Sequence, residues 1–218
     1  MFTELEGWFL LSLPFRRTDA KGSDYIQECS IPDDFDAKVS NPVEQLASIK
    51  DIHERRHACI SEHLMLLYFI ISEMNIKRIL ELGVGHGNST IAFLSGLKKN
   101  GGKLTSVDIV DWFEARRRVA EFNLGGNWEY IINNDMNLVW NEELDLLFID
   151  SSHEYTHTKS EIEKYEPFVR NGGYIIFHDT VICPQVEKAV DEFFSSHPSY
   201  IRYRWFHNSG LQVLKKVI

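Results

Sequence analysis

The chain has 218 residues, of which 44% are hydrophobic and 25% charged, a composition that excludes a largely disordered protein. Its 23 Lys and Arg stand against 32 Asp and Glu, so the net charge is −9 at neutral pH. Because phosphate backbones are bound by clustered Lys and Arg, this balance argues against a nucleic-acid partner. The length suits one compact domain with a small addition.

Cysteine usage, the acidic first residues and the length of the longest apolar stretch indicate a soluble cytoplasmic protein. Cys29, Cys59 and Cys183 are odd in number and widely separated, so they form neither a disulfide framework nor a zinc-binding spacing. The first residues are acidic, where a secretory signal needs a basic flank. The longest apolar stretch, Leu64–Ile71, is far shorter than the roughly 20 residues of a membrane span. We therefore expect no membrane association.

Residues 1–75 are expected to form an N-terminal arm and helical cap. Prolines and few periodic apolar positions predict loops and short elements at the start. Apolar residues at spacings of three after Pro42 predict one helix, and residues 57–75 predict another. Since irregular arms often pack on a partner subunit, a homo-oligomer is a candidate assembly.

Residues 76–218 alternate between strand and helix patterns. The predicted strands cover residues 78–82, 103–107, 129–132, 144–149 and 174–177, with helices over 89–98, 112–123, 156–170 and 185–195. Two further strands, 200–206 and 211–217, flank a short turn and must be antiparallel to each other. Asn171-Gly172-Gly173 is read as a helix stop. This alternation predicts an α/β fold with a mostly parallel sheet and right-handed crossovers.

A glycine-rich turn joins the first of these strands to the first helix. Gly83 and Gly85 allow the backbone to turn tightly and approach a ligand, and Ser89 with free amides opens the helix. Asp108 ends the next strand about 20 residues later, where an acid can bind two ribose hydroxyls. Together these residues predict a nucleoside-containing ligand at the carboxyl ends of the strands.

The spacing bears on which nucleoside is bound. The dinucleotide fingerprint, counted from Gly83, requires a third glycine where this chain has Asn88. Tyr155 and Lys159 have the spacing of a reductase Tyr-x-x-x-Lys pair, but they lie in a helix after the fourth strand. An NAD-dependent oxidoreductase is therefore an alternative that the glycine spacing disfavours.

The order acid-x-Gly-x-Gly-x-Gly, from Glu81 to Gly87, resembles the first motif of the class I S-adenosylmethionine (SAM)-dependent methyltransferases. The resemblance extends from residue 76 to the C-terminus and implies a seven-stranded Rossmann-like sheet, helices on both faces and an antiparallel last strand. It implies that the methionine end is held by Glu81, Gly83, Gly85 and Ser89, the ribose and adenine by Asp108 and Ile109, and the adenine edge by Asp135 and Met136.

Two aspartates that follow neighbouring apolar strands predict a metal site. Asp150 comes after strand 144–149 and Asp179 after strand 174–177, so both should point into one crevice. Converging carboxylates repel unless a cation or a proton lies between them. A hard divalent ion such as Mg²⁺ accepts carboxylate oxygens and keeps positions open for substrate hydroxyls.

This pair resembles the metal site of O-methyltransferases related to catechol O-methyltransferase. The resemblance makes Asp150 and Asp179 metal ligands, with Thr180 where that family has an asparagine ligand. His153 lies where that family has a lysine base, so His153 and Asp150 are the expected catalytic residues. The implied reaction is metal-assisted methyl transfer from SAM to a hydroxyl of a small molecule. Because Thr180 is a weaker ligand, His178 or water is an open alternative for completing the metal shell, and a buried structural role is also open for His178. The histidines other than His153 and His178 are interpreted as structural. A non-catalytic SAM-binding module is the second alternative function, since Thr180 departs from the pattern.

Overall fold

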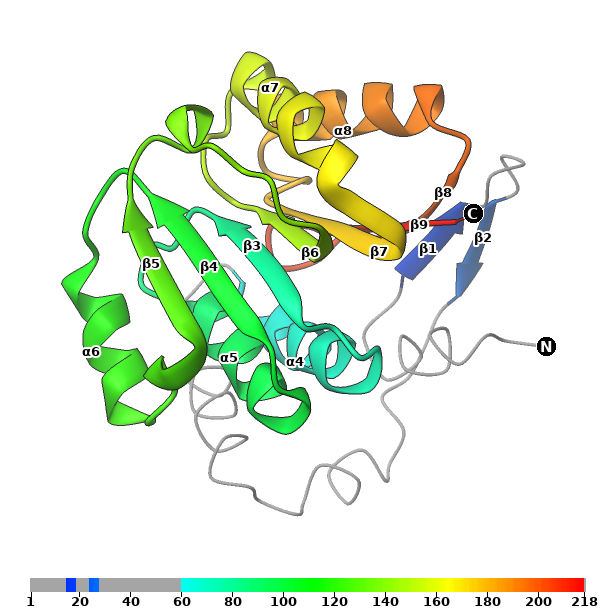
Figure 1. Cartoon of the computed structure of the whole chain (residues 1–218). Coiled ribbons are helices and arrows are strands. Elements are labelled where there is room, and N and C mark those ends of the chain that lie inside the picture. Colours follow the sequence, from blue (N-terminus) through cyan, green and yellow to red (C-terminus); the bar gives the residue numbers. More distant parts are fainter. Residues whose placement is uncertain (1–14, 19–23, 28–59, 218) are drawn as a thin grey trace.

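The structure is a computed structural model that describes residues 15–18, 24–27 and 60–217. In this part of the chain nine strands form one sheet, in the order β2-β1-β8-β9-β7-β6-β3-β4-β5 (Figure 1). The strands are β1 (Phe15–Thr18), β2 (Asp24–Gln27), β3 (Arg78–Leu82), β4 (Lys103–Asp108), β5 (Trp128–Ile132), β6 (Leu144–Ile149), β7 (Val169–His178), β8 (Tyr200–Trp205) and β9 (Leu211–Lys216). Counted from β3, the seven main strands run in the order 3-2-1-4-5-7-6, and the last, β9, is antiparallel to both neighbours. The predicted seven-stranded α/β sheet is confirmed.

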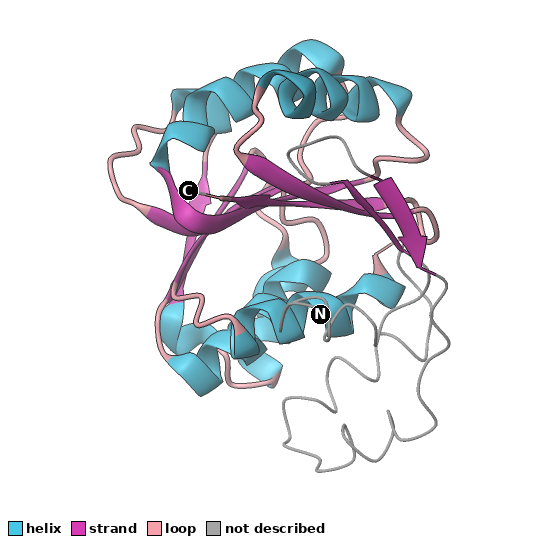
Figure 2. Cartoon of the chain, turned by 90° about the vertical axis from the view of Figure 1, so that its right-hand side faces the viewer, coloured by secondary structure: helices cyan, strands magenta, loops and turns pink. Residues whose placement is uncertain are grey.

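Helices cover both faces of the sheet (Figure 2). They are α4 (Leu64–Glu73), α5 (Asn88–Asn100), α6 (Phe113–Glu121), α7 (Tyr155–Tyr165) and α8 (Pro184–Ser196). Ile79 of β3 belongs to the apolar cluster beneath α4 and α5, whereas Leu80 and Leu82 belong to the cluster beneath α7 and α8. This explains why β6 is apolar at five of its six positions. None of the helices in the described ranges has the length and apolarity to cross a bilayer.

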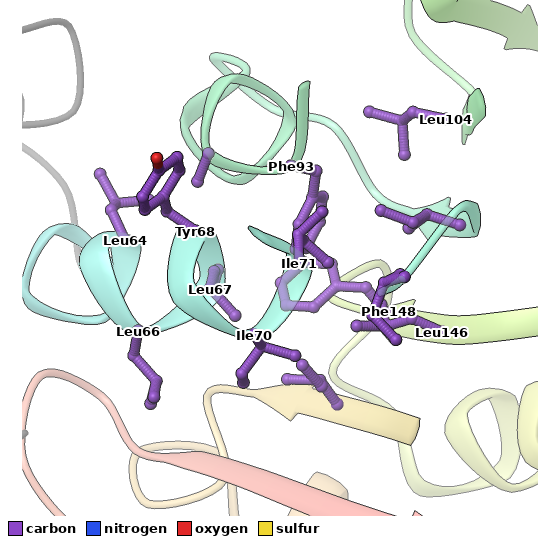
Figure 3. Packing of buried hydrophobic residues seen from close by; sticks show 14 of the residues in the cluster. Leu64, Leu66, Leu67, Tyr68, Ile70, Ile71, Phe93, Leu104, Leu146 and Phe148 are labelled. Atoms are coloured by element: carbon purple, nitrogen blue, oxygen red, sulfur yellow. The ribbon is translucent and has the colours of Figure 1, made fainter. Parts of the chain in front are cut away.

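Helix α4 packs directly on α5 and shares its apolar cluster with the sheet (Figure 3). Leu64, Leu67 and Ile71 are completely buried, and Phe93 of α5 lies in the same cluster. The two helices approach so closely that a Cβ on Gly96 would lie 2.5 Å from the Ile71 Cβ. Helix α4, which falls in the predicted cap, is thus part of the main core.

The sheet extends beyond the seven predicted strands. Strand β1 pairs antiparallel with β8, and β2 pairs antiparallel with β1. Both segments fall where the sequence predicts loops and short elements, because four residues are too few to show an alternating pattern. The helix predicted after Pro42 and residues 57–59 lie outside the described residues.

The predicted helix stop at Asn171-Gly172-Gly173 is wrong. Helix α7 ends at Tyr165, a 3-10 turn follows, and β7 already begins at Val169. Pro167 in that turn lacks a backbone N–H and cannot continue a helix. Gly172 instead has a φ of +76° within β7, where the register against β6 shifts.

Candidate active site

A cleft of about 480 Å³ lies at the carboxyl ends of β3, β4, β5 and β6. Parallel strands place their end residues along one edge, so segments distant in sequence meet there. The structure brings six of the predicted site residues into the lining of this cleft: Gly83, Gly85, Asp108, Ile109, Asp135 and Asp150. The other lining residues are Val107, Val110, Trp112, Asn133, Asn134, Ser151, Ser152 and His157.

The glycine turn lies against the end of β6. Gly83 has a φ of +89°, and a Cβ at this position would lie 2.1 Å from the Asp150 carbonyl oxygen. The Asp150 amide in turn donates a hydrogen bond to the Leu82 carbonyl, at 2.8 Å. Only glycine satisfies both the conformation and the close approach. This contact fixes Asp150 directly beside the turn.

Glu81 and Ser89 lie behind the turn rather than in the cleft. The Glu81 carboxylate is completely buried and accepts hydrogen bonds from the hydroxyls of Ser89 (2.6 Å), Thr90 (2.8 Å) and Ser106 (2.5 Å). Burial raises the pKa of Glu81 to about 7. Neither Glu81 nor Ser89 is among the described residues that line the cleft. Their contacts tie α5 to β3 and β4 and so support the turn.

Asp108 is held at the rim by the backbone around it. Its Oδ2 accepts hydrogen bonds from the Val84 amide (2.9 Å) and from Trp112 Nε1 (3.0 Å). Its Oδ1 accepts one from the Val110 amide, at 2.9 Å. Ile109 follows with 71% of its surface exposed. A carboxylate and an adjacent apolar side chain thus face the same opening.

The far end of the cleft holds an ionic cluster that the sequence analysis missed. His157 Nε2 lies 3.0 Å from Asp135 Oδ2 and 3.6 Å from Glu161 Oε1, and the Ser151 hydroxyl donates to Glu161. The nearby Glu161 carboxylate raises the pKa of His157 to about 9, and burial raises the pKa of Glu161 to about 8. The sequence signal that could have revealed this cluster is the i, i+4 spacing of His157 and Glu161, which places both side chains on one face of α7. Met136 is half-buried, and its amide donates to Asp135 Oδ1.

The second predicted aspartate lies one strand further along. Asp179 is buried just after β7, with a φ of +57° that is uncommon outside glycine. His153 Nε2 lies 2.9 Å from Asp179 Oδ2. His178 Nδ1 lies 3.3 Å from Asp150 Oδ1 and 3.2 Å from Asp179 Oδ1. The structure therefore brings the two aspartates together around His178.

This group of side chains fits a divalent cation. Asp150, His178 and Asp179 each offer one ligand atom, and these atoms lie within 4.8 Å of one another. Although burial opposes a charge on the imidazole, the Asp150 and Asp179 carboxylates raise the pKa of His178 to about 10. The field at this point therefore favours a positive charge. Thr180, the third predicted ligand, is 1% exposed.

Comparison with known proteins assigns the fold and the cleft to one class of enzyme. Residues 80–180 match a family model described as a methyltransferase domain, and this range contains the glycine turn and both aspartates. Residues 80–180 thus belong to a methyltransferase domain, and the strand order is that of the class I SAM-dependent methyltransferases. In the sheet of this methyltransferase, β9 lies between β7 and β8. The usual dinucleotide-binding sheet has the strand order 3-2-1-4-5-6, in which no strand separates the fifth from the sixth. This difference argues against the oxidoreductase alternative.

Solved structures share the fold of this methyltransferase at low sequence identity. A Staphylococcus aureus protein assigned as a caffeoyl-CoA O-methyltransferase has a TM-score of 0.66 at 20% identity, over 83% of this chain and 96% of that one. An O-methyltransferase from Bacillus cereus in complex with S-adenosylhomocysteine (SAH) has a TM-score of 0.64 at 18% identity, over 84% and 96%. The O-methyltransferase TomG from Streptomyces achromogenes, in complex with SAM, has a TM-score of 0.64 at 15% identity, over 84% and 94%. No curated protein matches the sequence.

Proposed function

We propose that this methyltransferase transfers a methyl group from SAM to a hydroxyl group of a small molecule, assisted by a divalent cation. The observation that carries the proposal is the position of Asp150, which both lines the cleft and belongs to the cluster with His178 and Asp179. The sites for the methyl donor and for the acceptor would therefore have Asp150 in common. The O-methyltransferases from B. cereus and S. achromogenes support the choice of a hydroxyl acceptor.

The cleft offers a complementary surface to each part of SAM. We assign the ribose hydroxyls to the Asp108 carboxylate, the adenine face to Ile109 and the adenine edge to Asp135 and Met136. The methionine end would lie over the backbone of Gly83 and Gly85. Three carboxylates line the cleft, those of Asp108, Asp135 and Asp150, and their negative field favours the positively charged sulfonium.

The transfer is an in-line displacement, in which the bond from the acceptor oxygen to the methyl carbon forms as the carbon–sulfur bond breaks. The acceptor hydroxyl must lose its proton, and we assign this proton to His153. Its Nε2 lies beside the Asp179 carboxylate, which favours a proton on Nε2 and leaves the lone pair of Nδ1 to act as the base. When bound, a cation held by Asp150 and Asp179, with Thr180 as the third expected ligand, lowers the pKa of the hydroxyl.

A transfer assay tests this function. The protein is incubated with SAM carrying an isotope-labelled methyl group, a panel of catechols, phenols and sugars, and either a divalent cation or a chelator. We expect acceptor-dependent release of SAH, label on an acceptor oxygen, and loss of turnover with the chelator.

Asp150→Asn should abolish most of this turnover, whereas Glu121→Gln should not, because Glu121 is exposed and forms a surface ion pair with Arg117. Methyl transfer to nitrogen or carbon acceptors alone would contradict the proposal. Tight SAH binding without transfer to any hydroxyl would instead favour the non-catalytic module.

A further inference from the structure

His178 is a buried histidine whose polar atoms lack hydrogen-bond partners. It ends β7, its side chain has no exposed surface, and neither Nδ1 nor Nε2 makes a hydrogen bond within the described part of the chain. Asp179 Oδ1, which faces it, is likewise without a hydrogen bond. Buried polar atoms of this kind are costly, so a cluster of three at one place indicates a ligand or an ion.

The contacts of His178 have the distances of a coordination shell but not the geometry of hydrogen bonds. Nδ1 lies 3.3 Å from Asp150 Oδ1 and 3.2 Å from Asp179 Oδ1, yet neither oxygen accepts a hydrogen bond from it. Neighbouring ligands on a cation with bonds of about 2.1 Å are separated by about 3.0 Å in an octahedron and about 3.4 Å in a tetrahedron. The two separations at His178 fall within this range.

We propose that His178 Nδ1 is a ligand of the catalytic cation, and that the set of Asp150, Asp179 and His178 selects a transition metal such as Mn²⁺, Fe²⁺, Co²⁺ or Zn²⁺ over Mg²⁺. The proposal rests on the proposed function in placing a cation at this cluster. Imidazole nitrogen is a common ligand of zinc and iron, whereas Mg²⁺ prefers oxygen ligands and keeps several waters. His178 then takes the place expected for Thr180.

Side chains around His178 pack against its ring and provide further nitrogen and sulfur atoms that can bind a metal. His63 packs edge-on against it, with ring centroids 6.1 Å apart, and His63 Nε2 lies 3.2 Å from the His207 carbonyl oxygen. On the other side of Asp179, ligand atoms of His153 and Cys183 lie within 4.8 Å of its carboxylate. Nitrogen and sulfur donors close to a carboxylate pair suit a borderline metal better than Mg²⁺.

Metal titrations of the chelator-treated full chain test the proposal. We expect Co²⁺ and Mn²⁺ to bind at one site per chain, at least about tenfold more tightly than Mg²⁺, by calorimetry. His178→Asn replaces the nitrogen donor by an amide oxygen, so this preference should fall by at least about tenfold. His197→Asn is the matched control, because His197 lies at the end of α8 outside the described cluster. SAH affinity should be unchanged in both variants.

Three results would overturn the proposal: tighter binding of Mg²⁺ than of Co²⁺ by the wild-type chain, an unchanged preference in His178→Asn, or no cation binding. If His178→Asn fails to fold, the wild-type chain with ¹⁵N-labelled histidine answers the question. Pulsed electron paramagnetic resonance of bound Mn²⁺ should show coupling to a histidine nitrogen, and its absence would exclude the ligand. Methyl transfer that persists without the transition-metal preference would reject this inference alone, whereas failure of transfer to hydroxyls would reject the proposed function.

Discussion

Asp108 is the residue on which cofactor binding should depend most. Its carboxylate is oriented by the Val84 and Val110 amides and lines the cleft. Loss of hydrogen bonds from a charged group costs about 1.5–3 kcal/mol, so Asp108→Ala should weaken SAH binding about 10- to 100-fold in calorimetry. Asp111→Asn is the control, since Asp111 is exposed and pairs with Arg116. Equal effects of the two substitutions would show that Asp108 has no specific role.

His153 should affect turnover without affecting cofactor affinity. It contacts Asp179 but is not among the described residues that line the cleft. General-base catalysis contributes about 10²- to 10⁴-fold, so His153→Gln should lower kcat by that order while the Kd of SAH stays the same. Single-turnover kinetics with saturating SAM measures this directly. A kcat within twofold of the wild type would remove His153 from the mechanism.

The sequence predicted the residues that line the cleft at the ends of strands. It missed residues whose environment is created by side chains far away in the sequence. Gly83, Asp108 and Asp150 line the cleft because each lies at the end of a strand that its apolar pattern reveals. His157 lies within a helix and has no such signal, whereas His178 ends an apolar strand, which does not reveal that its ring lies between two carboxylates. Their environment is created by Asp135 and Asp150, which reach them only through the fold. The place of Glu81 in the motif did not reveal that its carboxylate is completely buried.

Among the elements, the contact between α4 and α5 is sensitive to an added methyl group at Gly96. A Cβ on Gly96 would lie 2.5 Å from the Ile71 Cβ, whereas a Cβ on Gly126 would meet nothing within 4 Å. Replacing Gly by Ala within a helix normally raises the free energy of unfolding by about 1 kcal/mol, whereas overpacking lowers it by about 1–3 kcal/mol. Gly96→Ala should therefore lower the free energy of unfolding measured in urea, and Gly126→Ala should not. A stabilised Gly96→Ala protein would contradict the close packing.

The elements that the sequence predicted are those with a long periodic signal. Strand β6 was predicted with its observed bounds, because five of its six buried residues are apolar and only Asp145 interrupts the run. The pairing of β1 with β8 could not be predicted, since it joins segments of four and six residues from opposite ends of the chain. The start of β7 was hidden by Gly172, whose positive φ belongs to a bulge rather than a helix end.

For the molecule as a whole, raised pKa values predict that stability falls as the pH rises above neutrality. Burial raises the pKa of Glu81 to about 7 and of Glu161 to about 8, and the nearby Glu161 carboxylate raises the pKa of His157 to about 9. The folded chain then binds these protons more tightly than the unfolded chain does. The stability from His157 is complete below its unfolded pKa of about 6.5 and is lost as the pH passes about 9.

Urea denaturation at pH 7, 8 and 9 measures this dependence. The free energy of unfolding should decrease along the series, and Glu161→Gln should reduce the slope because it removes an ionisation. Glu163→Gln, an exposed position on the same helix, should keep the wild-type slope. A free energy that stays constant or rises from pH 7 to pH 9 would contradict the raised pKa values.

The central claim is that the cleft at the carboxyl ends of β3, β4, β5 and β6 binds the SAM donor. Calorimetric titration of the purified chain with SAH, and separately with NAD, tests it most directly. We predict binding of one SAH per chain, weakened by Asp108→Ala, and no heat of binding for NAD. Absence of SAH binding, or binding that Asp108→Ala leaves unchanged, would contradict the account.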